Sequence, residues 1–233
     1  ITCTLGTKLP VNQISQLGKE KGLLVFIDGA HGTGSMSVDV QEIGCDFYAS
    51  CGHKWLLGSK GTGYLFIKEE LLDQVEPKWV GSYSDIGWYL NEEGAELFGY
   101  NPTAHRYDFG TQNVALYYGV ETAIELMETI GMKKIEARIT YLQDYLREKL
   151  KTLGEKVTYL SSHEKDSQGP MLSFSPKDKD AHMLFKDAIH TTKQRFRVRH
   201  VPEANLNCIR VSTHIFNTED ELDQFIEWLD GYL

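Results

Sequence analysis

The sequence has few cysteines, no long apolar run and no concentration of positive charge, and each absence argues against a class of protein. The four cysteines lack C-x-x-C spacing, which argues against a disulfide scaffold and favours free thiols in a reducing compartment. No apolar run approaches the roughly 20 residues that a membrane helix needs. The 24 Lys and Arg residues are scattered in a chain of net charge -9, which argues against a basic nucleic-acid-binding face. We therefore expect a cytoplasmic protein that binds neither nucleic acid nor membrane.

Three common ligand-binding patterns are also missing. The stretch "GSKGTG", residues 58–63, lacks the spacing of a P-loop, and "GAHGTG", residues 29–34, lacks the third glycine of a dinucleotide fingerprint. Asp28, His31 and His53 do not have the one-turn spacing of paired zinc ligands. We expect neither of these nucleotide loops and no metal site.

The first half of the chain alternates strand-like and helix-like segments. Residues 10–22 carry apolar side chains at helical spacing, between a proline suited to a first turn and a glycine stop. The apolar run "LLVFID", residues 23–28, is typical of a parallel strand covered on both faces. Together with the extended-looking "ITCTL" at residues 1–5, these segments predict a βαβ crossover. Further strands are predicted around residues 47–48 and at 63–68.

The second half begins with long amphipathic helices between Val114 and Gly154. The elements expected after them are strands at 170–175, 195–201 and 208–216, and a helix at 181–190. A last helix should begin at Thr218, where Thr218 and Glu221 have the spacing of a capping box. We predict an α/β fold: a mostly parallel large domain over residues 1–130 and a small α+β domain over residues 131–233.

Two strand ends carry residues suited to chemistry. The run "VFIDGAHGTG" places Asp28 at the end of a buried strand, where an acid is costly without a partner. The stretch "SCGHKWLLGSKGTG", residues 50–63, runs from a strand through small residues to His53 and Lys54. Strand ends line the ligand crevice of α/β sheets. A lysine in that position is either a solvated end or a nucleophile.

These residues carry a family resemblance. The stretch "DGAH", followed by "CDFYASCGHKWLLGSKGTGYL" at residues 45–65, resembles the class V family of pyridoxal-phosphate (PLP) enzymes. That family includes cysteine desulfurases, isopenicillin N epimerase-like proteins and several aminotransferases. The resemblance implies PLP as the cofactor and the fold type I architecture, incomplete at the N-terminus because only the later part of the family pattern is present.

The resemblance implies roles for four residues near the cofactor ring. Lys54 would form a Schiff base with PLP and move the substrate's Cα proton. Asp28 would pair with the pyridine nitrogen, which keeps the ring cationic. His31 would lie beside the ring, and the alternative is a loop histidine packed by its neighbours. His53 would donate to the cofactor phosphate.

Other matched residues concern the phosphate and the substrate. Ser50 and Cys51 occupy the region where relatives have a small hydroxyl donor, and a thiol is a weak donor. In "RYDFGTQN" Thr111 matches a threonine that reaches the phosphate of a neighbouring subunit, which implies a homodimer; the alternative is a simple turn. In "CIRVSTHIFNTEDEL" Arg210 matches an arginine for the substrate α-carboxylate. The alternative for Arg210 is an exposed strand residue.

The expected function is a PLP-dependent reaction at the Cα of an amino acid, of the class V aminotransferase or isopenicillin N epimerase-like kind. A cysteine desulfurase or C–S lyase is the alternative, but residues 195–207, where the resemblance places a nucleophilic cysteine, contain none. Cys208 follows in a predicted strand. A non-catalytic fragment is a further alternative, since the first part of the family pattern is missing. We expect a fragment, a proteolysed product or one chain of a split enzyme.

Overall fold

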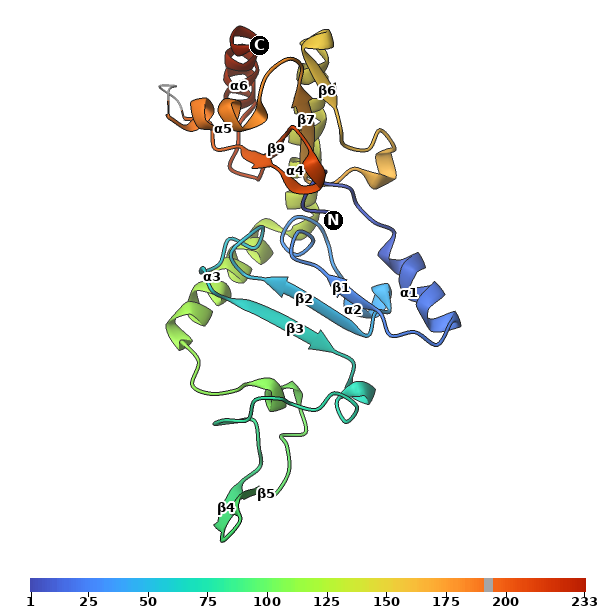
Figure 1. The fold of residues 1–233 in the computed structure, drawn as a ribbon, viewed down its shortest axis with the longest axis vertical. Helices are drawn as coiled ribbons and strands as arrows, with labels where there is room; N and C mark the ends of the chain where they lie inside the picture. Colours follow the sequence, from blue (N-terminus) through green and yellow to red (C-terminus); the bar gives the residue numbers. More distant parts are fainter. Residues whose placement is uncertain (191–194) are drawn as a thin grey trace. The chain divides into compact units, whose positions relative to one another are not determined.

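A computed structural model describes residues 1–190 and 195–233, which form two compact units (Figure 1). The C-terminal unit comprises residues 1–10, 31–38 and 126–233, and the sheet unit comprises residues 11–30 and 39–125. The predicted domain boundary between residues 130 and 131 stays a prediction. No helix in the described part of the chain is long and apolar enough to cross a membrane.

The sheet unit is built on three strands in the order β1-β2-β3 (Figure 1). These are β1 (Phe26–Asp28), β2 (Phe47–Cys51) and β3 (Gly63–Ile67), with β1 and β2 parallel and β3 antiparallel to β2. The helical elements of this unit are α1 (Val11–Glu20), α2 (Val40–Ile43), η1 (Glu69–Leu71), η2 (Ala104–Tyr107) and the first part of α3 (Val114–Ile130). The positions of the strands and of the first helix agree with the sequence prediction. The predicted burial of the first strand on both faces is wrong: β1 begins at Phe26, which is 58% exposed, and lies at the edge of the sheet, so Asp28 ends an exposed strand.

The βαβ crossover predicted from residues 1–5 is wrong in its first strand. Those residues form a turn, closed by a hydrogen bond from Gly6 N–H to Thr2 O at 3.1 Å. The parallel pair is instead connected through α2, so the crossover that forms is β1-α2-β2. An extended-looking segment became a turn because its backbone has other partners, which belong to the C-terminal unit.

A β-hairpin in the sheet unit was not predicted. It consists of β4 (Trp88–Asn91) and β5 (Gly94–Leu97), paired antiparallel. All eight strand residues are exposed, so the hairpin has no alternation of apolar and polar side chains to mark it. The aromatic residues and the Asn-Glu-Glu-Gly turn were the only local signals available.

The C-terminal unit is a four-stranded antiparallel sheet with helices packed on one face (Figure 1). The strand order is β6-β7-β9-β8, with β6 (Val157–Tyr159), β7 (Met171–Pro176), β8 (Arg199–Val201) and β9 (Cys208–Ser212). The helical elements are the end of α3, α4 (Met132–Lys151), α5 (Ala181–His190), α6 (Glu219–Tyr232), η3 (Gly154–Lys156), η4 (Lys165–Ser167) and η5 (Glu203–Asn205). The predicted strand at 195–201 is shorter than expected.

The core of this unit lies between the sheet and the helices. Leu172 and Phe174 of β7 and Ile209 of β9 are fully buried and contact the apolar faces of the helices. The helix residues in the same cluster are Leu142, Leu146, Leu150, Leu184, Leu222, Phe225 and Leu229. The period-2 pattern of the strands places the remaining residues on the opposite face of the sheet.

The N-terminal segment, residues 1–10, crosses that opposite face. Ser173 Oγ donates to Thr4 O at 2.8 Å, and Ser161 Oγ donates to Leu5 O at 2.6 Å. These buried serine hydroxyls provide the carbonyls of the N-terminal segment with hydrogen-bond donors, which a paired strand would otherwise have to supply. The segment therefore belongs to the C-terminal unit although it is distant in sequence.

The last helix begins as predicted. Thr218 is the N-cap, its hydroxyl accepts from Glu221 N–H, and the Glu221 side chain accepts from Thr218 N–H, which completes the capping box. In the first turn, Glu219 accepts from Arg138 of α4 in a two-point contact at 2.8 and 3.0 Å. The contact ties the start of α6 to α4.

This ion pair predicts a pH dependence of stability. The Arg138 guanidinium lowers the pKa of Glu219 from 4.5 to about 2. Because the folded pKa is below the unfolded one, the stabilising effect is fully present above pH 4.5 and is lost as the pH falls toward 2. In urea unfolding we expect Glu219→Gln to lower the midpoint at pH 7 and to converge with the wild type near the acid end. Glu227→Gln, an exposed change on the same helix, is the control and should leave the urea midpoint unchanged at pH 7 and at the acid end. A difference in midpoint between wild type and Glu219→Gln that is the same at every pH would contradict the assignment.

Candidate active site

The carboxyl ends of β1 and β2 meet at one edge of the sheet unit. Asp28 is the last residue of β1 and pairs with Ala49, while β2 ends two residues later at Cys51. The Asp28 side chain is exposed, and Oδ1 accepts a hydrogen bond from Ala30 N–H at 2.9 Å. This is its only hydrogen bond or ion pair within the described residues, so its remaining acceptor positions are available to a ligand.

The loop after β2 presents His53 and Lys54 at this same edge. Gly52 N–H donates to Thr62 O at 3.0 Å, and Gly58 N–H donates to Gly52 O at 2.7 Å, which closes the loop tightly. A Cβ on Gly52 would lie 2.3 Å from Thr62 Oγ1, and one on Gly58 would lie 2.9 Å from Gly52 O. Gly58 is therefore required by a close backbone approach, and Gly52 by the close Thr62 side chain. His53 is exposed and Lys54 is partly buried.

Ser50 and Cys51 both donate to the segment that follows β1. Ser50 Oγ donates to Gly29 O at 3.1 Å, and Cys51 Sγ lies 3.8 Å from Ala30 O, the length of a weak thiol hydrogen bond. These contacts fix the position of the chain just after Asp28. Roles of Ser50 and Cys51 toward a cofactor stay predictions.

Thr111 lies in the connection between η2 and α3, and its side chain is exposed. The start of this connection is anchored by Arg106, whose side chain is buried. Arg106 Nη1 donates to Leu72 O at 2.7 Å and to Asp73 Oδ1 at 2.9 Å, and Nε donates to Asn101 O at 2.8 Å. Arg106 is the first residue of the motif that contains Thr111, but its residue type and spacing alone predicted no role for it.

In the C-terminal unit, Arg210 lies on the sheet face opposite the helices. It stands between Ser173 of β7 and Arg199 of β8 in the strand register, and Nη1 donates to the carbonyl of Cys3. Burial lowers the pKa of Arg210, and the charge of Arg199 lowers that pKa further. Arg210 Nε is buried and has no hydrogen-bond partner among the described residues. A buried cationic donor in this state is suited to an anionic acceptor such as a carboxylate.

His31 also belongs to the C-terminal unit. Its side chain is buried, and its carbonyl accepts from Ser35 Oγ at 2.7 Å, which forms part of the compact turn over residues 31–36. Since Asp28 and Lys54 lie in the sheet unit, the structure groups Asp28, Ser50, Cys51, His53 and Lys54 at one sheet edge and holds His31 and Arg210 in the other unit.

The cysteines differ in accessibility. Cys208 shares the sheet face of Arg210, as its strand position predicts, but it is 0% exposed. Burial raises the pKa of the Cys208 thiol, which keeps it protonated and poorly nucleophilic. Cys3 is exposed, and its carbonyl accepts from Arg210. A nucleophilic role is therefore disfavoured for Cys208 on physical grounds.

The comparisons with known proteins agree with this arrangement. The fold is that of PLP-dependent enzymes of fold type I: a cysteine desulfurase from Thermococcus onnurineus matches 100% of the chain with a TM-score of 0.88 and 25% identity. The cystine C–S lyase C-DES, solved with its product cysteine persulfide, matches 98% of the chain with a TM-score of 0.85 and 25% identity. The family model described as aminotransferase class-V matches residues 1–225, so the chain belongs to this family, whose members use PLP.

Curated relatives have two different names. A probable cysteine desulfurase from Halobacterium salinarum is 30% identical over 99% of this chain, and isopenicillin N epimerase from Streptomyces clavuligerus is 28% identical over 99% of it. The chain spans 55% and 58% of the lengths of these two relatives. The family resemblance, the fold class and the cofactor predicted from the sequence are thus confirmed, while the particular reaction is not decided.

The residues at the sheet edge fit PLP by their chemistry. A PLP site needs an amine for the aldehyde, an acid for the pyridine nitrogen and donors for the phosphate. The sheet unit supplies Lys54, Asp28 and His53 from two adjacent strand ends. The Asp28 carboxylate has one hydrogen bond from the described residues and can accept another.

Proposed function

We propose that the protein is a PLP-dependent enzyme that acts at the Cα of an amino acid, with Lys54 as the covalent attachment point of the cofactor. The observation that carries the proposal is the placement of Asp28 and the His53–Lys54 loop at the same carboxyl edge of β1 and β2. When bound, PLP supplies the electron sink for the bond that breaks at Cα. Racemisation, transamination and elimination all begin with this step.

Each residue then has a defined task. The Asp28 carboxylate holds a proton on the pyridine nitrogen, and the Lys54 amine moves the proton at Cα. His53 donates to the phosphate, together with Ser50 or Cys51, and His31 lies beside the ring. The planar guanidinium of Arg210 binds the substrate α-carboxylate and orients the bonds at Cα.

The proposal includes a homodimer, in which Thr111 of one subunit reaches the cofactor phosphate of the other. The exposure of Thr111 in a connection anchored by Arg106 supports this assignment. We place the protein in the cytoplasm, as the cysteine content suggests.

Reductive trapping tests the attachment site. When the protein is incubated with PLP and then with borohydride, we expect one cofactor per chain on the peptide that contains Lys54. Lys60, an exposed lysine in the same glycine-rich loop, is the internal control and should stay unlabelled. Labelling spread over both lysines, or unchanged in Lys54→Arg, would contradict the proposal.

Cysteine desulfuration is a second candidate, which Cys3 favours. Its thiol is exposed, and its carbonyl contacts the arginine proposed to bind substrate. In such a reaction the Cys3 thiolate attacks Sγ of substrate cysteine and the Cβ–S bond breaks. The bonding electrons stay on Cβ, which takes up a proton, so that alanine and a Cys3 persulfide are formed.

Mass spectrometry after alkylation distinguishes the two candidates. If the PLP-loaded protein desulfurates L-cysteine, we expect a mass increase of one sulfur on the Cys3 peptide, which is lost in Cys3→Ser and retained in the matched variant Cys208→Ser. Release of pyruvate without persulfide on Cys3 would reject desulfuration and leave β-elimination, in which loss of the Cα proton is followed by cleavage of the Cβ–S bond.

A further inference from the structure

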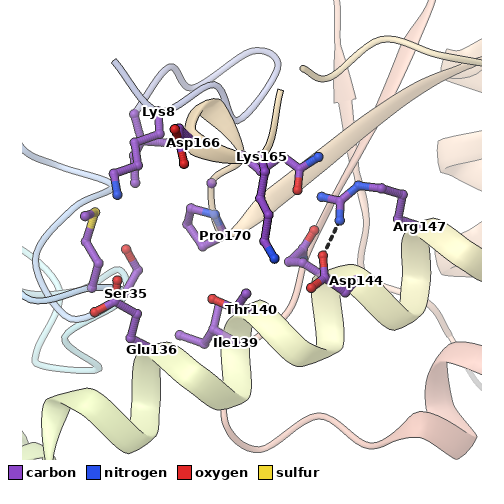
Figure 2. A pocket seen from close by; sticks show the side chains of 15 residues that line it. Lys8, Ser35, Glu136, Ile139, Thr140, Asp144, Arg147, Lys165, Asp166 and Pro170 are labelled. Atoms are coloured by element: carbon purple, nitrogen blue, oxygen red, sulfur yellow. Dashed lines mark hydrogen bonds and ion pairs between the residues drawn. The ribbon is translucent and has the colours of Figure 1, made fainter. Parts of the chain in front are cut away.

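The C-terminal unit contains a cavity that the proposed active-site residues do not line. It has a volume of about 230 Å³ and lies among the N-terminal segment, the loop over residues 31–38, helix α4 and the connection that contains η4 (Figure 2). Neither His31 nor Arg210 contributes to its wall. A cavity of about 150 Å³ already accommodates benzene, so this one is large enough for a small polar metabolite.

The wall is fixed by backbone contacts rather than by side chains alone. Lys8 N–H donates to Ser167 O at 2.9 Å, and Thr7 and Gln168 form a β-bridge. A Cβ on Gly169 would lie 2.3 Å from Gly6 O, so glycine is required for this close approach. The two chain segments that carry Lys8 and Lys165 are therefore held together before any ligand binds.

Gln143 is the most informative residue of the wall. It occupies an inward position of α4 between the apolar residues Ile139 and Leu146, and its side chain is only 2% exposed. Its Nε2 donates to Thr213 Oγ1 at 2.8 Å, but Oε1 has no partner among the described residues. A buried acceptor without a donor is costly. A ligand that offers an N–H or O–H group would remove this cost.

The charged groups of the wall have both signs. Lys8 and Lys165 have no ion-pair partner in the part of the chain that the structure describes, and Figure 2 shows the Lys165 side chain extending toward α4. On α4, Glu136 accepts from Ser37 N–H at 3.2 Å, and Asp144 pairs with Arg147. The Lys165 ammonium, which has no carboxylate partner among the described residues, thus extends toward a helix that offers Glu136 and the Gln143 acceptor, and Lys8 lines the same cavity.

We propose that this cavity binds a zwitterionic small molecule, a free α-amino acid. Its carboxylate contacts the ammonium groups of Lys165 and Lys8, and its ammonium donates to Gln143 Oε1 and to the Glu136 carboxylate. The apolar residues Ile139 and Pro170 accommodate a small side chain. This site is separate from the proposed substrate contact at Arg210 and does not depend on the proposed function.

The test uses Lys54→Ala protein without PLP, so that cofactor chemistry cannot contribute, and follows binding by saturation-transfer NMR. The probes are L-alanine, propionate, which lacks the ammonium, and ethylamine, which lacks the carboxylate. We expect saturable binding of L-alanine and at least about tenfold weaker binding of the other two, since each leaves one set of polar groups unpaired.

Variants locate the site. Gln143→Leu should weaken L-alanine binding about tenfold, because it removes the buried acceptor while keeping the side-chain volume. Lys165→Gln, an exposed change that cannot disturb the core, should weaken it about threefold, and the exposed Lys133→Gln should have no effect. Three results would overturn the proposal: equal binding of propionate and L-alanine, no saturable binding of L-alanine, or L-alanine binding that neither Gln143→Leu nor Lys165→Gln changes. If PLP failed to attach to Lys54, the proposed function would be wrong but this cavity proposal would stand.

Discussion

Asp28→Asn is expected to weaken PLP binding by about 2–5 kcal/mol, or about 30-fold to 5,000-fold, the cost of removing one member of a hydrogen-bonded charge pair. The amide keeps the shape of the side chain but has no charge to hold a proton on the pyridine nitrogen. The rate of exchange of the substrate Cα proton should fall as well, because a neutral ring accepts electrons poorly. PLP titration followed by visible absorbance measures the first effect, and proton exchange in deuterated water measures the second.

The control for Asp28 is Glu42→Gln, which removes one carboxylate charge from an exposed position in the same unit. It should bind PLP as the wild type does. Urea unfolding of Asp28→Asn without cofactor should match the wild type closely, since the Asp28 side chain is exposed and accepts a single backbone hydrogen bond. Unchanged PLP affinity in Asp28→Asn would remove the physical basis of the assignment.

Arg106→Met is expected to lower the free energy of unfolding of the sheet unit by about 2–4 kcal/mol. The substitution keeps an unbranched apolar side chain but leaves Asn101 O without the donor that Arg106 provides, and leaves Leu72 O with only the hydrogen bond from Tyr107 Oη at 3.3 Å. Losing a hydrogen bond to a charged group costs about 1.5–3 kcal/mol, and an acceptor left without a donor costs on the order of 1–3 kcal/mol. Urea unfolding followed by tryptophan fluorescence suits the measurement, because Trp55, Trp79 and Trp88 lie in this unit.

Two variants separate the contribution of the Arg106 hydrogen bonds to carbonyls from the contribution of its ion pair with Asp73. Asp73 is 93% exposed at its side chain, so Asp73→Asn should cost less than about 1 kcal/mol. Arg197→Met, at an exposed arginine, should change stability by less than about 0.5 kcal/mol. If Asp73→Asn were as damaging as Arg106→Met, the ion pair and not the buried carbonyls would be the source of the effect.

Local sequence patterns predicted many of the regular elements. The helix over residues 219–232 begins at Thr218 because its capping box needs only residues three apart. β2 and the loop with His53 and Lys54 follow from a short apolar run and a specific glycine pattern. These features depend on contacts between residues close in sequence, and such contacts can be predicted from the local sequence.

Features that depend on distant partners were missed. Residues 1–5 look extended, but their carbonyls accept from Ser161, Ser173 and Arg210, more than 150 residues away in sequence. The exposed hairpin β4-β5 has no buried face to produce an alternating pattern. The strand position of Cys208 predicted its face correctly, but only packing shows that this thiol is inaccessible.

The sequence by itself determined the family and, through it, the PLP cofactor, and it placed Asp28, His53 and Lys54 at or just after strand ends, because their spacing is read directly along the chain. The tertiary structure decided which buried polar groups find partners. Arg106 satisfies the carbonyl of Leu72, which is 34 residues away, and that of Asn101, whereas Gln143 Oε1 and Arg210 Nε find no partner among the described residues. The physical reason is that a hydrogen bond requires a donor and an acceptor close together. The sequence shows which donors and acceptors exist, but only the folded chain shows which of them pair.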